Sequence, residues 1–263
     1  MPVDFQRYLL AKRSVDDRAL NRIVWQHLAA LLPPNSNVIE IACGIGTMRA
    51  RMHAWGLLTT AARYRGVDSD PENIRAACSG DFPGKPVFEC ADLFALEAES
   101  DHDLLVAAAF LDLVDLDEAL PQLLAFIRPG GLAYFPIHFD GLTLFEPSHP
   151  GDDRILAAYH HSMDARLSGG HSRTGRRLFT ALPAAGYEIL AAGGSDWVVH
   201  PGPEGVYPGD EAYFLESILQ FFETSCAGVE GLEDWLATRQ AQVNGGRLVF
   251  IAHQFDFLAR KPG

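Results

Sequence analysis

The stretch VIEIACGIGTMRARM, from Val38 to Met52, decides the fold of this chain. An apolar strand runs into a turn that contains Gly44 and Gly46, and the turn runs into a helix. Glycines in such a turn let a ligand approach the backbone closely, and the start of the helix offers unpaired N–H groups. The stretch therefore predicts a nucleotide-binding unit, and the residues around the glycines indicate which nucleotide it serves.

The spacing of the glycines disfavours two classes of ligand. A dinucleotide site requires G-x-G-x-x-G, but the place of the third glycine is taken by Arg49. A nucleoside triphosphate loop requires Gly-Lys-Ser/Thr, but Thr-Met-Arg follows Gly46. What remains is an acidic residue, Glu40, separated by three residues from a Gly-x-Gly turn.

Strands and helices alternate through the first half of the chain. Strands are predicted at 38–42, 64–67, 87–90, 103–109 and 132–139. Helices are predicted between them at 47–55, at 71–79 after the capping residue Asp70, and from about 117 to the RPGG at 128–131. This alternation is typical of a parallel, doubly wound α/β sheet.

The two ends of the chain do not follow this alternation of strands and helices. Ser14 with Asp17 predicts an N-cap that opens an N-terminal helix, which ends before Pro33. Beyond Asp140 we expect helices at 153–167, 174–185, 211–226 and 232–243, an extended segment at 187–200 and a final strand at 247–258.

Four further segments extend the pattern of the glycine turn. They are YRGVDSDPENI with Asp68, FECADLFAL with Asp92, DLLVAAAFLDLV, and LLAFIRPGGLAYF. With these segments in this order, residues 38–139 resemble the class I S-adenosylmethionine-dependent methyltransferases. The resemblance implies a Rossmann-like, doubly wound seven-stranded sheet whose last strand is antiparallel, with helical insertions after strands 5 and 6.

The same resemblance implies that three parts of a single domain, residues 1–263, have different roles. Residues 1–37 would form an N-terminal helical lid, 38–139 the cofactor-binding core, and 140–263 the substrate cap helices and final strands. Asp68 would accept from both ribose hydroxyls, and Asp92 would take the adenine amino group. The cofactor-binding residues expected for S-adenosylmethionine are Glu40, Ala42, Gly44, Gly46, Asp68, Ser69, Asp92, Leu93, Phe110 and Asp112.

The methyl acceptor is expected beyond the carboxyl ends of the fourth and fifth strands, because ligands of open parallel sheets bind there. A hydroxyl acceptor would need a base, and His138, Asp140 and His160 are the candidates. On the helix expected at 153–167, Tyr159 and Arg166 fall within the apolar stripe and are predicted to contact the acceptor, whereas His161 faces solvent.

The sequence therefore favours transfer of a methyl group to a small molecule by in-line displacement at an oxygen or nitrogen nucleophile. Arg154, Arg166 and Arg173 favour an anionic acceptor. The residues do not distinguish O-, N-, C- and S-methylation. Two alternatives remain open: a non-catalytic S-adenosylmethionine-binding regulatory or scaffold protein, and a nicotinamide-dependent oxidoreductase with a degenerate turn.

Composition and charge exclude other partners. A formal net charge of -13 and a pI of about 5.1 disfavour nucleic acid and anionic lipid surfaces. The longest apolar run, Leu104 to Leu111, is too short to span a bilayer, and no signal-peptide pattern precedes it, so we expect a cytoplasmic protein. Neither C-x-x-C nor H-x-x-x-H occurs, so we expect no disulfide and no metal site. The oligomeric state is not predicted.

Overall fold

A mixed eight-stranded sheet runs through residues 3–263, the part of the chain that the computed structural model describes. The strand order is β3-β2-β1-β4-β5-β8-β6, with the short β7 beside β8. The strands are β1 (Asn37–Ile41), β2 (Arg63–Asp68), β3 (Val87–Cys90), β4 (His102–Ala107), β5 (Ile127–Glu146), β6 (Glu188–Gly194), β7 (Trp197–Val199) and β8 (Val249–Arg260).

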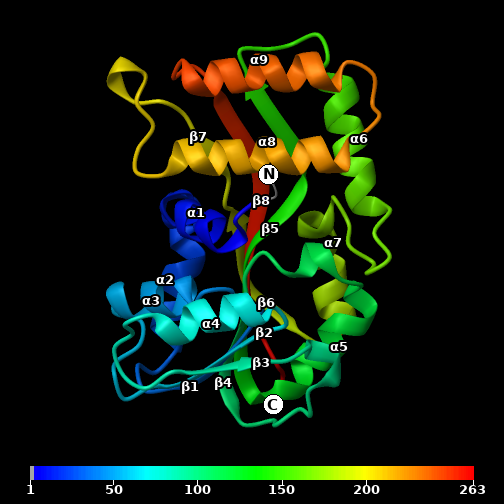
Figure 1. Ribbon diagram of the computed structural model, residues 1–263. Helices are drawn as coiled ribbons and strands as arrows, with labels where there is room; N and C mark the ends of the chain where they lie inside the picture. Colours follow the sequence, from blue (N-terminus) through cyan, green and yellow to red (C-terminus); the bar gives the residue numbers. More distant parts are fainter. Residues whose placement is uncertain (1–2) are drawn as a thin grey trace.

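Helices cover both faces of this sheet (Figure 1). Helices α2 and α3 pack on one face, and α5 and α7 pack on the other. The helices are α1 (Phe5–Ala19), α2 (Arg22–Leu31), α3 (Thr47–Ala54), α4 (Pro71–Ser79), α5 (Leu116–Phe126), α6 (Asp152–Asp164), α7 (Thr174–Ala184), α8 (Glu211–Ser225) and α9 (Leu232–Asn244). Because strands between two helical layers are buried on both sides, the last four residues of β4, Leu104 to Ala107, are all apolar.

Strand direction confirms the doubly wound arrangement with an antiparallel last strand. Neighbouring strands are parallel from β3 to β5, whereas β8 is antiparallel to β5, β6 and β7. The expected number of seven strands is wrong by one, because Trp197–Val199 adds the short β7 to β8. The strand order reverses between β1 and β4, and such a reversal opens a crevice at the carboxyl ends of the strands.

The N-terminal region contains two helices instead of the one that Ser14 was expected to open. Asp4 caps α1, where its side chain accepts from the Arg7 N–H, and Ser14 lies inside that helix. The chain then breaks at Leu20, and the side chain of Asn21 accepts from two N–H groups at the start of α2. A cap with two bonds to the backbone makes a new helix start there favourable. Residues 1 and 2 of the expected lid lie outside the described residues.

Strand β5 is much longer than the predicted strand at 132–139. It continues to Glu146 because its second half pairs with β8, from Thr143 opposite Ala252 to Glu146 opposite Val249. Gly141, with a φ of +74°, lies in the irregular stretch where the register shifts. The β5–β8 pair therefore extends beyond the parallel sheet, and α6, α8 and α9 pack against this extension (Figure 1).

Helix α6 ends earlier than predicted, at Asp164, so Arg166 lies in the following loop. The chain turns there because the Asp164 carboxylate accepts from the Ser172 N–H at 2.7 Å. That bond returns the loop to the sheet, where the His171 N–H donates to the backbone oxygen of Asp112. Leu167, which was expected on the buried stripe, is fully exposed.

Candidate functional site

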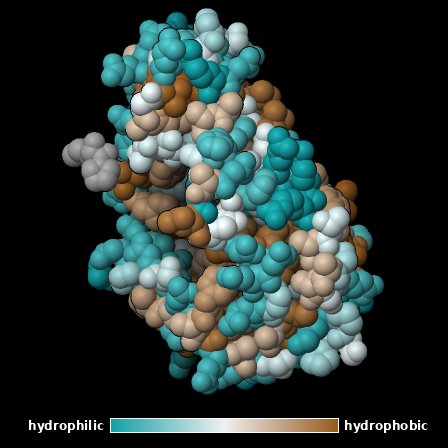
Figure 2. Space-filling view, turned by 90° about the vertical axis from the view of Figure 1, so that its right-hand side faces the viewer, coloured by the Kyte–Doolittle hydropathy of each residue, from teal (hydrophilic) through white to brown (hydrophobic). Residues whose placement is uncertain are grey.

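A cavity of about 550 Å³ lies over the carboxyl ends of the central strands and continues beneath α1, α6 and α8. Figure 2 shows a hollow bordered by hydrophobic side chains on one face of the molecule. The lower part of the cavity contains residues that follow β1, β2 and β4: Ala42, Gly44, Asp68, Ser69, Phe110 and Asp112. Six of the ten predicted cofactor residues therefore lie together, at the strand-order reversal.

Gly44 and Gly46 serve different purposes in the turn. Gly44 lines the cavity with a φ of +56°, and a Cβ there would lie 3.1 Å from the Leu9 Cδ1 atom of α1. Gly46, with a φ of +82°, caps α3 outside the cavity, and a Cβ there would lie 2.7 Å from the Phe82 ring. Gly44 thus lets α1 close over the turn, whereas Gly46 makes room for the packing of an aromatic ring.

Asp68 lines the cavity at the end of β2, where it holds the surrounding loops in place. Its carboxylate accepts from the Gly44 N–H at 2.8 Å, from the Asp70 N–H at 2.9 Å and from the Asn73 amide at 3.1 Å. A carboxylate offers about four acceptor positions, so about one remains for a ligand. Binding both ribose hydroxyls would therefore require one of these three donors to move.

Glu40 lies in β1 below the cavity and does not line it. Its side chain is buried and accepts from the Tyr64 hydroxyl. Burial raises the pKa of Glu40 well above its usual value, the charge of Arg51 opposes this shift, and the charge of Asp68 adds to it. The structure therefore favours a protonated Glu40, which acts as a neutral hydrogen-bonding group.

Glu40→Gln tests this protonation. The stability that a carboxyl with a raised folded-state pKa contributes is full below its unfolded pKa, near 4.5, and is lost as the pH rises towards the folded value. Glutamine keeps the acceptor for Tyr64 and removes this loss. The variant should melt about 2–4 °C higher than the wild type at pH 8 and at the same temperature near pH 4.5, by scanning calorimetry. Equal melting temperatures at pH 8 would contradict a protonated Glu40.

Three residues that line the cavity have a backbone conformation that side chains other than glycine rarely adopt. The φ angles are +55° at Ala42, +49° at Ala109 and +62° at Ile137, directly after β1 and β4 and within β5. The Ile137 N–H donates to the buried carboxylate of Asp256 at 2.8 Å, which holds this turn in place. Strain of this kind costs about 1–3 kcal/mol per residue and concentrates at functional sites. Periodicity in the sequence gave no signal of it.

Asp92 and Leu93 lie beside the cavity but do not line it. Asp92 is exposed at the end of β3, where its carboxylate accepts from the Phe94 N–H at 2.9 Å. Leu93 is buried, and its carbonyl accepts from Gln122 of α5. The Ala91 N–H donates to the Asp68 carbonyl, which places this segment next to the β2 end of the cavity.

The three predicted base residues do not line the cavity. His138 is fully buried, and neither ring nitrogen has a hydrogen-bond partner among residues 3–263. The Asp140 carboxylate is occupied by Arg176 at the start of α7, with the backbone N–H at 2.6 Å and Nε at 2.9 Å. His160 Nε2 lies 3.1 Å from the Thr143 hydroxyl, and burial is the main cause that lowers the pKa of its imidazole.

Asp112 is the polar group that separates His138 from the cavity. It lines the cavity, and its Oδ1 atom lies 3.8 Å from His138 Nδ1. The resemblance implied a cofactor role for Asp112. In the structure Asp112 lies beside His138, so a residue expected to bind the cofactor and a residue expected to act as a base are neighbours.

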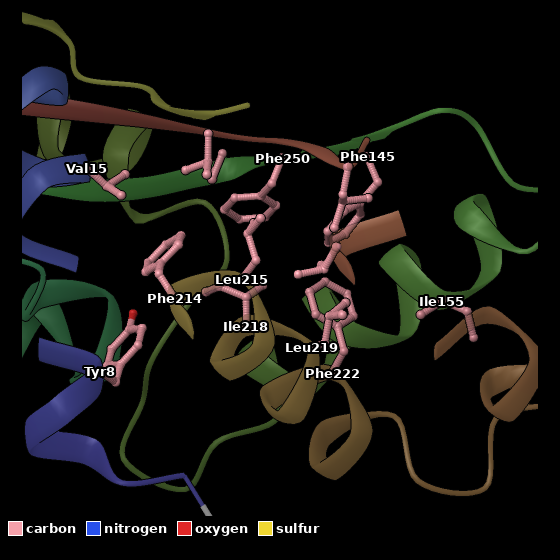
Figure 3. Packing of buried hydrophobic residues seen from close by; sticks show 14 of the residues in the cluster. Tyr8, Val15, Phe145, Ile155, Phe214, Leu215, Ile218, Leu219, Phe222 and Phe250 are labelled. Atoms are coloured by element: carbon pink, nitrogen blue, oxygen red, sulfur yellow. The ribbon is translucent and has the colours of Figure 1, made fainter. Parts of the chain in front are cut away.

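The upper part of the cavity, which we call the upper chamber, is walled by aromatic rings that sequence reasoning mostly missed. Figure 3 shows Tyr8 of α1, Phe250 of β8, and Phe214 and Phe222 of α8 converging with other apolar residues in the core around it. Only Tyr159 of this wall was predicted, and its ring stacks on Phe222 with 3.9 Å between ring centroids. We define the chamber by Tyr8, Phe139, Tyr159, Trp197, Phe222 and Phe250.

Tyr159 and Arg166, which are predicted from the sequence to contact the acceptor, both line the cavity. Burial raises the pKa of Tyr159 to about 12, although the charge of Arg166 opposes the shift. Arg154 forms an ion pair with Glu230 outside the cavity, and Arg173 does not line it either. Of the three arginines that favoured an anionic acceptor, only Arg166 lines the cavity.

Within residues 3–263, no group of three or more His, Cys, Asp or Glu side chains is arranged to hold a metal ion. Every helix that the structure describes is too short or too polar to cross a bilayer.

Comparison with known proteins identifies the fold. No protein-family model and no curated protein sequence matches the chain. Solved structures match it across nearly its whole length. A Bacillus halodurans C-125 protein with a provisional methyltransferase assignment has a TM-score of 0.55 and 13% identity, over 90% of this chain and 100% of that one. The chain has the fold of the class I methyltransferases.

Two further solved structures share this methyltransferase fold. The cyclopropane synthase MmaA2 from Mycobacterium tuberculosis has a TM-score of 0.53 and 14% identity, over 91% of this chain and 83% of that one. Geranyl diphosphate C-methyltransferase from Streptomyces coelicolor A3(2) has a TM-score of 0.50 and 12% identity, over 91% of this chain and 75% of that one. The latter was crystallised with Mg²⁺, geranyl diphosphate and S-adenosyl-L-homocysteine.

Proposed function

We propose that the protein is a cytoplasmic S-adenosylmethionine-dependent methyltransferase that methylates a small molecule at an oxygen or nitrogen nucleophile. The observation that carries this proposal is the continuity of the cavity. One continuous cavity joins the glycine turn and Asp68 to the upper chamber, so a cofactor in the lower part would present its methyl group to an acceptor above. The S-adenosylhomocysteine bound by the geranyl diphosphate enzyme supports the choice of cofactor.

In this proposal the lower cavity residues hold the cofactor. Asp68 accepts from the ribose, Gly44 and Ala42 let the methionine part approach the backbone, and Ser69 and Phe110 contact the nucleoside. Asp92 and the Leu93 backbone take the adenine at the end of β3. The wall of α1, α6 and α8 excludes water and aligns the acceptor, and orientation of this kind can contribute roughly 7–11 kcal/mol to the rate.

The size of the whole cavity favours a small acceptor, because the same space would also hold the cofactor. A cavity of about 550 Å³ falls within the range of roughly 300–1,000 Å³ that is usual for small-molecule sites. Residues 3–37 act as the lid in this proposal, because α1 contributes Phe5, Tyr8, Leu9 and Lys12 to the cavity. The proposed substrate cap of residues 140–263 contributes most of the remaining wall, with Tyr159, Trp197 and Phe222 among its residues.

Calorimetric titration with S-adenosylhomocysteine and, separately, with NADH tests the proposal. We expect S-adenosylhomocysteine to bind with a dissociation constant in the micromolar range, roughly -8 kcal/mol, and NADH not to bind. Tighter binding of NADH would favour an oxidoreductase. Incubation with S-adenosylmethionine and fractionated metabolite extracts should then release S-adenosylhomocysteine. Cofactor binding without release in any fraction would favour the non-catalytic alternative.

A further inference from the structure

The upper chamber has few polar groups, and most of its charges are already neutralised. Lys12 forms an ion pair with Asp16 at 3.1 Å and lies over the Trp197 ring at 5.2 Å. Asp68 carries three donors, and Asp70 caps α4. Asp68 and Asp70 thus have N–H donors, whereas Asp112 and Arg166 form neither an ion pair with a fixed charge nor a side-chain hydrogen bond within residues 3–263.

Asp112 is a largely buried carboxylate of the cavity wall. Its side chain is 13% exposed, and its Oδ1 atom has no hydrogen-bond partner among the described residues. His138 Nδ1, at 3.8 Å, is too distant for a hydrogen bond. The buried Oε1 atom of Gln254, which also lines the cavity, has no partner in the described chain either.

Both of these unpartnered atoms are oxygens, and an oxygen of this kind accepts hydrogen bonds. A buried acceptor without a donor costs about 1–3 kcal/mol, and more when the group is charged, so a ligand that supplies donors is favoured over one that supplies acceptors. None of the nitrogen atoms that are buried without a partner in residues 3–263 belongs to a residue that lines the cavity. Among the fully buried atoms of the cavity, the unmet bonding capacity is therefore on the acceptor side.

The aromatic wall and the net charge also favour a cationic ligand. Ring faces attract ammonium groups, and several rings around one carboxylate form a suitable site for a cation that carries an apolar body. Tyr8 and Tyr159 line the same cavity as Asp112; burial raises the pKa of both phenols, and the charge of Asp112 adds to both shifts. The net charge of -13 draws cations towards the protein and repels anions.

We propose that the methyl acceptor is an amine on an aromatic or similarly bulky apolar body, with its ammonium group against Asp112 and its body against the rings of the upper chamber. This inference rests on the proposed function, and it replaces the anionic acceptor that the arginines favoured. The ammonium passes one proton to Asp112, and the freed nitrogen lone pair attacks the methyl carbon. The N–C bond forms as the C–S bond breaks, and the electron pair of that bond remains on sulfur in S-adenosylhomocysteine.

His138 is a positioning residue in this arrangement. It is fully buried behind Asp112 and has no access to the cavity. A shift of several tenths of an ångström would bring its Nδ1 atom into hydrogen-bond range of Asp112 Oδ1. The imidazole would then fix the orientation of the carboxylate and stabilise its charge.

Three probes of matched size test the acceptor class on protein saturated with S-adenosylhomocysteine. They are 2-phenylethylamine, 2-phenylethanol and phenylacetate, which carry a cationic, a neutral and an anionic group. Calorimetry or ligand-observed NMR should show the amine binding at least about tenfold more tightly than either of the others. Only the amine can place a positively charged donor against the Asp112 carboxylate. Equal or tighter binding of the alcohol or the carboxylate would overturn the proposal.

Substitutions then test which residues cause the preference for the amine. Asp112→Asn should weaken binding of the amine at least about tenfold, whereas Asp153→Asn, the same charge change at an exposed position of α6, should leave it unchanged. Arg166→Gln should strengthen amine binding, since it removes a like charge. Amine binding that Asp112→Asn does not change, or phenylacetate binding that depends on Arg166, would refute the assignment.

The affinity for S-adenosylhomocysteine, measured on the same samples, separates the two levels of inference. If no variant and no wild-type sample binds it, the proposed function itself fails. If it binds normally and the amine shows no preference, only the acceptor class is wrong. The comparison of the three probes on the wild type needs no substitution, so it remains decisive even if Asp112→Asn folds poorly.

Discussion

Asp68→Ala is expected to weaken the binding of S-adenosylhomocysteine by about a hundredfold or more, measured by isothermal titration calorimetry. The proposed ribose contact is a hydrogen bond to a charged group, worth roughly 1.5–3 kcal/mol, or about ten- to a hundredfold in affinity. The substitution also releases the N–H groups of Gly44 and Asp70 and the amide of Asn73, which now define the shape of the lower cavity. The two effects act together, so the loss should exceed that of a single contact.

Asp81→Ala is the matched control for this experiment. Asp81 is exposed in the loop after α4 and does not line the cavity, so its removal tests the loss of one acidic charge without the loss of the site. We expect its affinity to equal that of the wild type. If Asp68→Ala retained affinity within about threefold of the wild type while remaining folded, the carboxylate would be a scaffold for the loops and would not hold the ligand.

Trp235→Ala is expected to lower the free energy of unfolding by about 3–5 kcal/mol, the range found for large aromatic residues truncated in a core. Trp235 is fully buried in α9, where its ring packs against those of Phe145 and Phe222, with 5.2 Å between the ring centroids in each pair. Its Nε1–H donates to Asp152 at 2.7 Å, and Asp152 also pairs with the buried Arg239. Truncation therefore opens a cavity and removes one donor from a buried ion pair. Urea denaturation measures the change.

Trp235→Phe separates the two contributions. Phenylalanine keeps most of the packing against Phe145 and Phe222 but cannot donate to Asp152, so its loss should be about 1–3 kcal/mol. A loss below 1 kcal/mol for Trp235→Ala would mean that the core around α8 and α9 does not depend on this residue. Because Tyr159 stacks on Phe222, Trp235→Ala should also weaken amine binding in the upper chamber more than cofactor binding below it.

Local sequence rules were sufficient for the central part of the fold. The capping side chain of Asp70, the proline at the first position of α4 and the glycine turn before α3 act within a few residues, and these elements lie where the sequence predicts them. The break before Asn21 is also a local signal, but the apolar spacing across it resembled one continuous helix.

Local sequence rules do not predict features that depend on contacts between residues far apart in the sequence. The second half of β5 is a strand because it pairs with β8, whose partner residues lie about a hundred positions later. Asp140 was a reasonable candidate base until the fold brought Arg176 to its carboxylate. The rings of the upper chamber come from α1, β5, α6, β7, α8 and β8, so no single stretch of sequence contains the pattern that they form.

The joint construction of β5 and β8 has a consequence for how acceptor specificity changes. The first half of β5 pairs with β4 inside the parallel sheet, and the second half pairs only with β8, beneath α6, α8 and α9. Exchanging the distal half of this ribbon with its three helices would alter the proposed acceptor compartment while leaving the loops of the proposed cofactor site untouched. Chimeras of methyltransferases joined at the Gly141 bulge and its counterpart in β8 should thus recombine acceptor choice with an unchanged cofactor affinity.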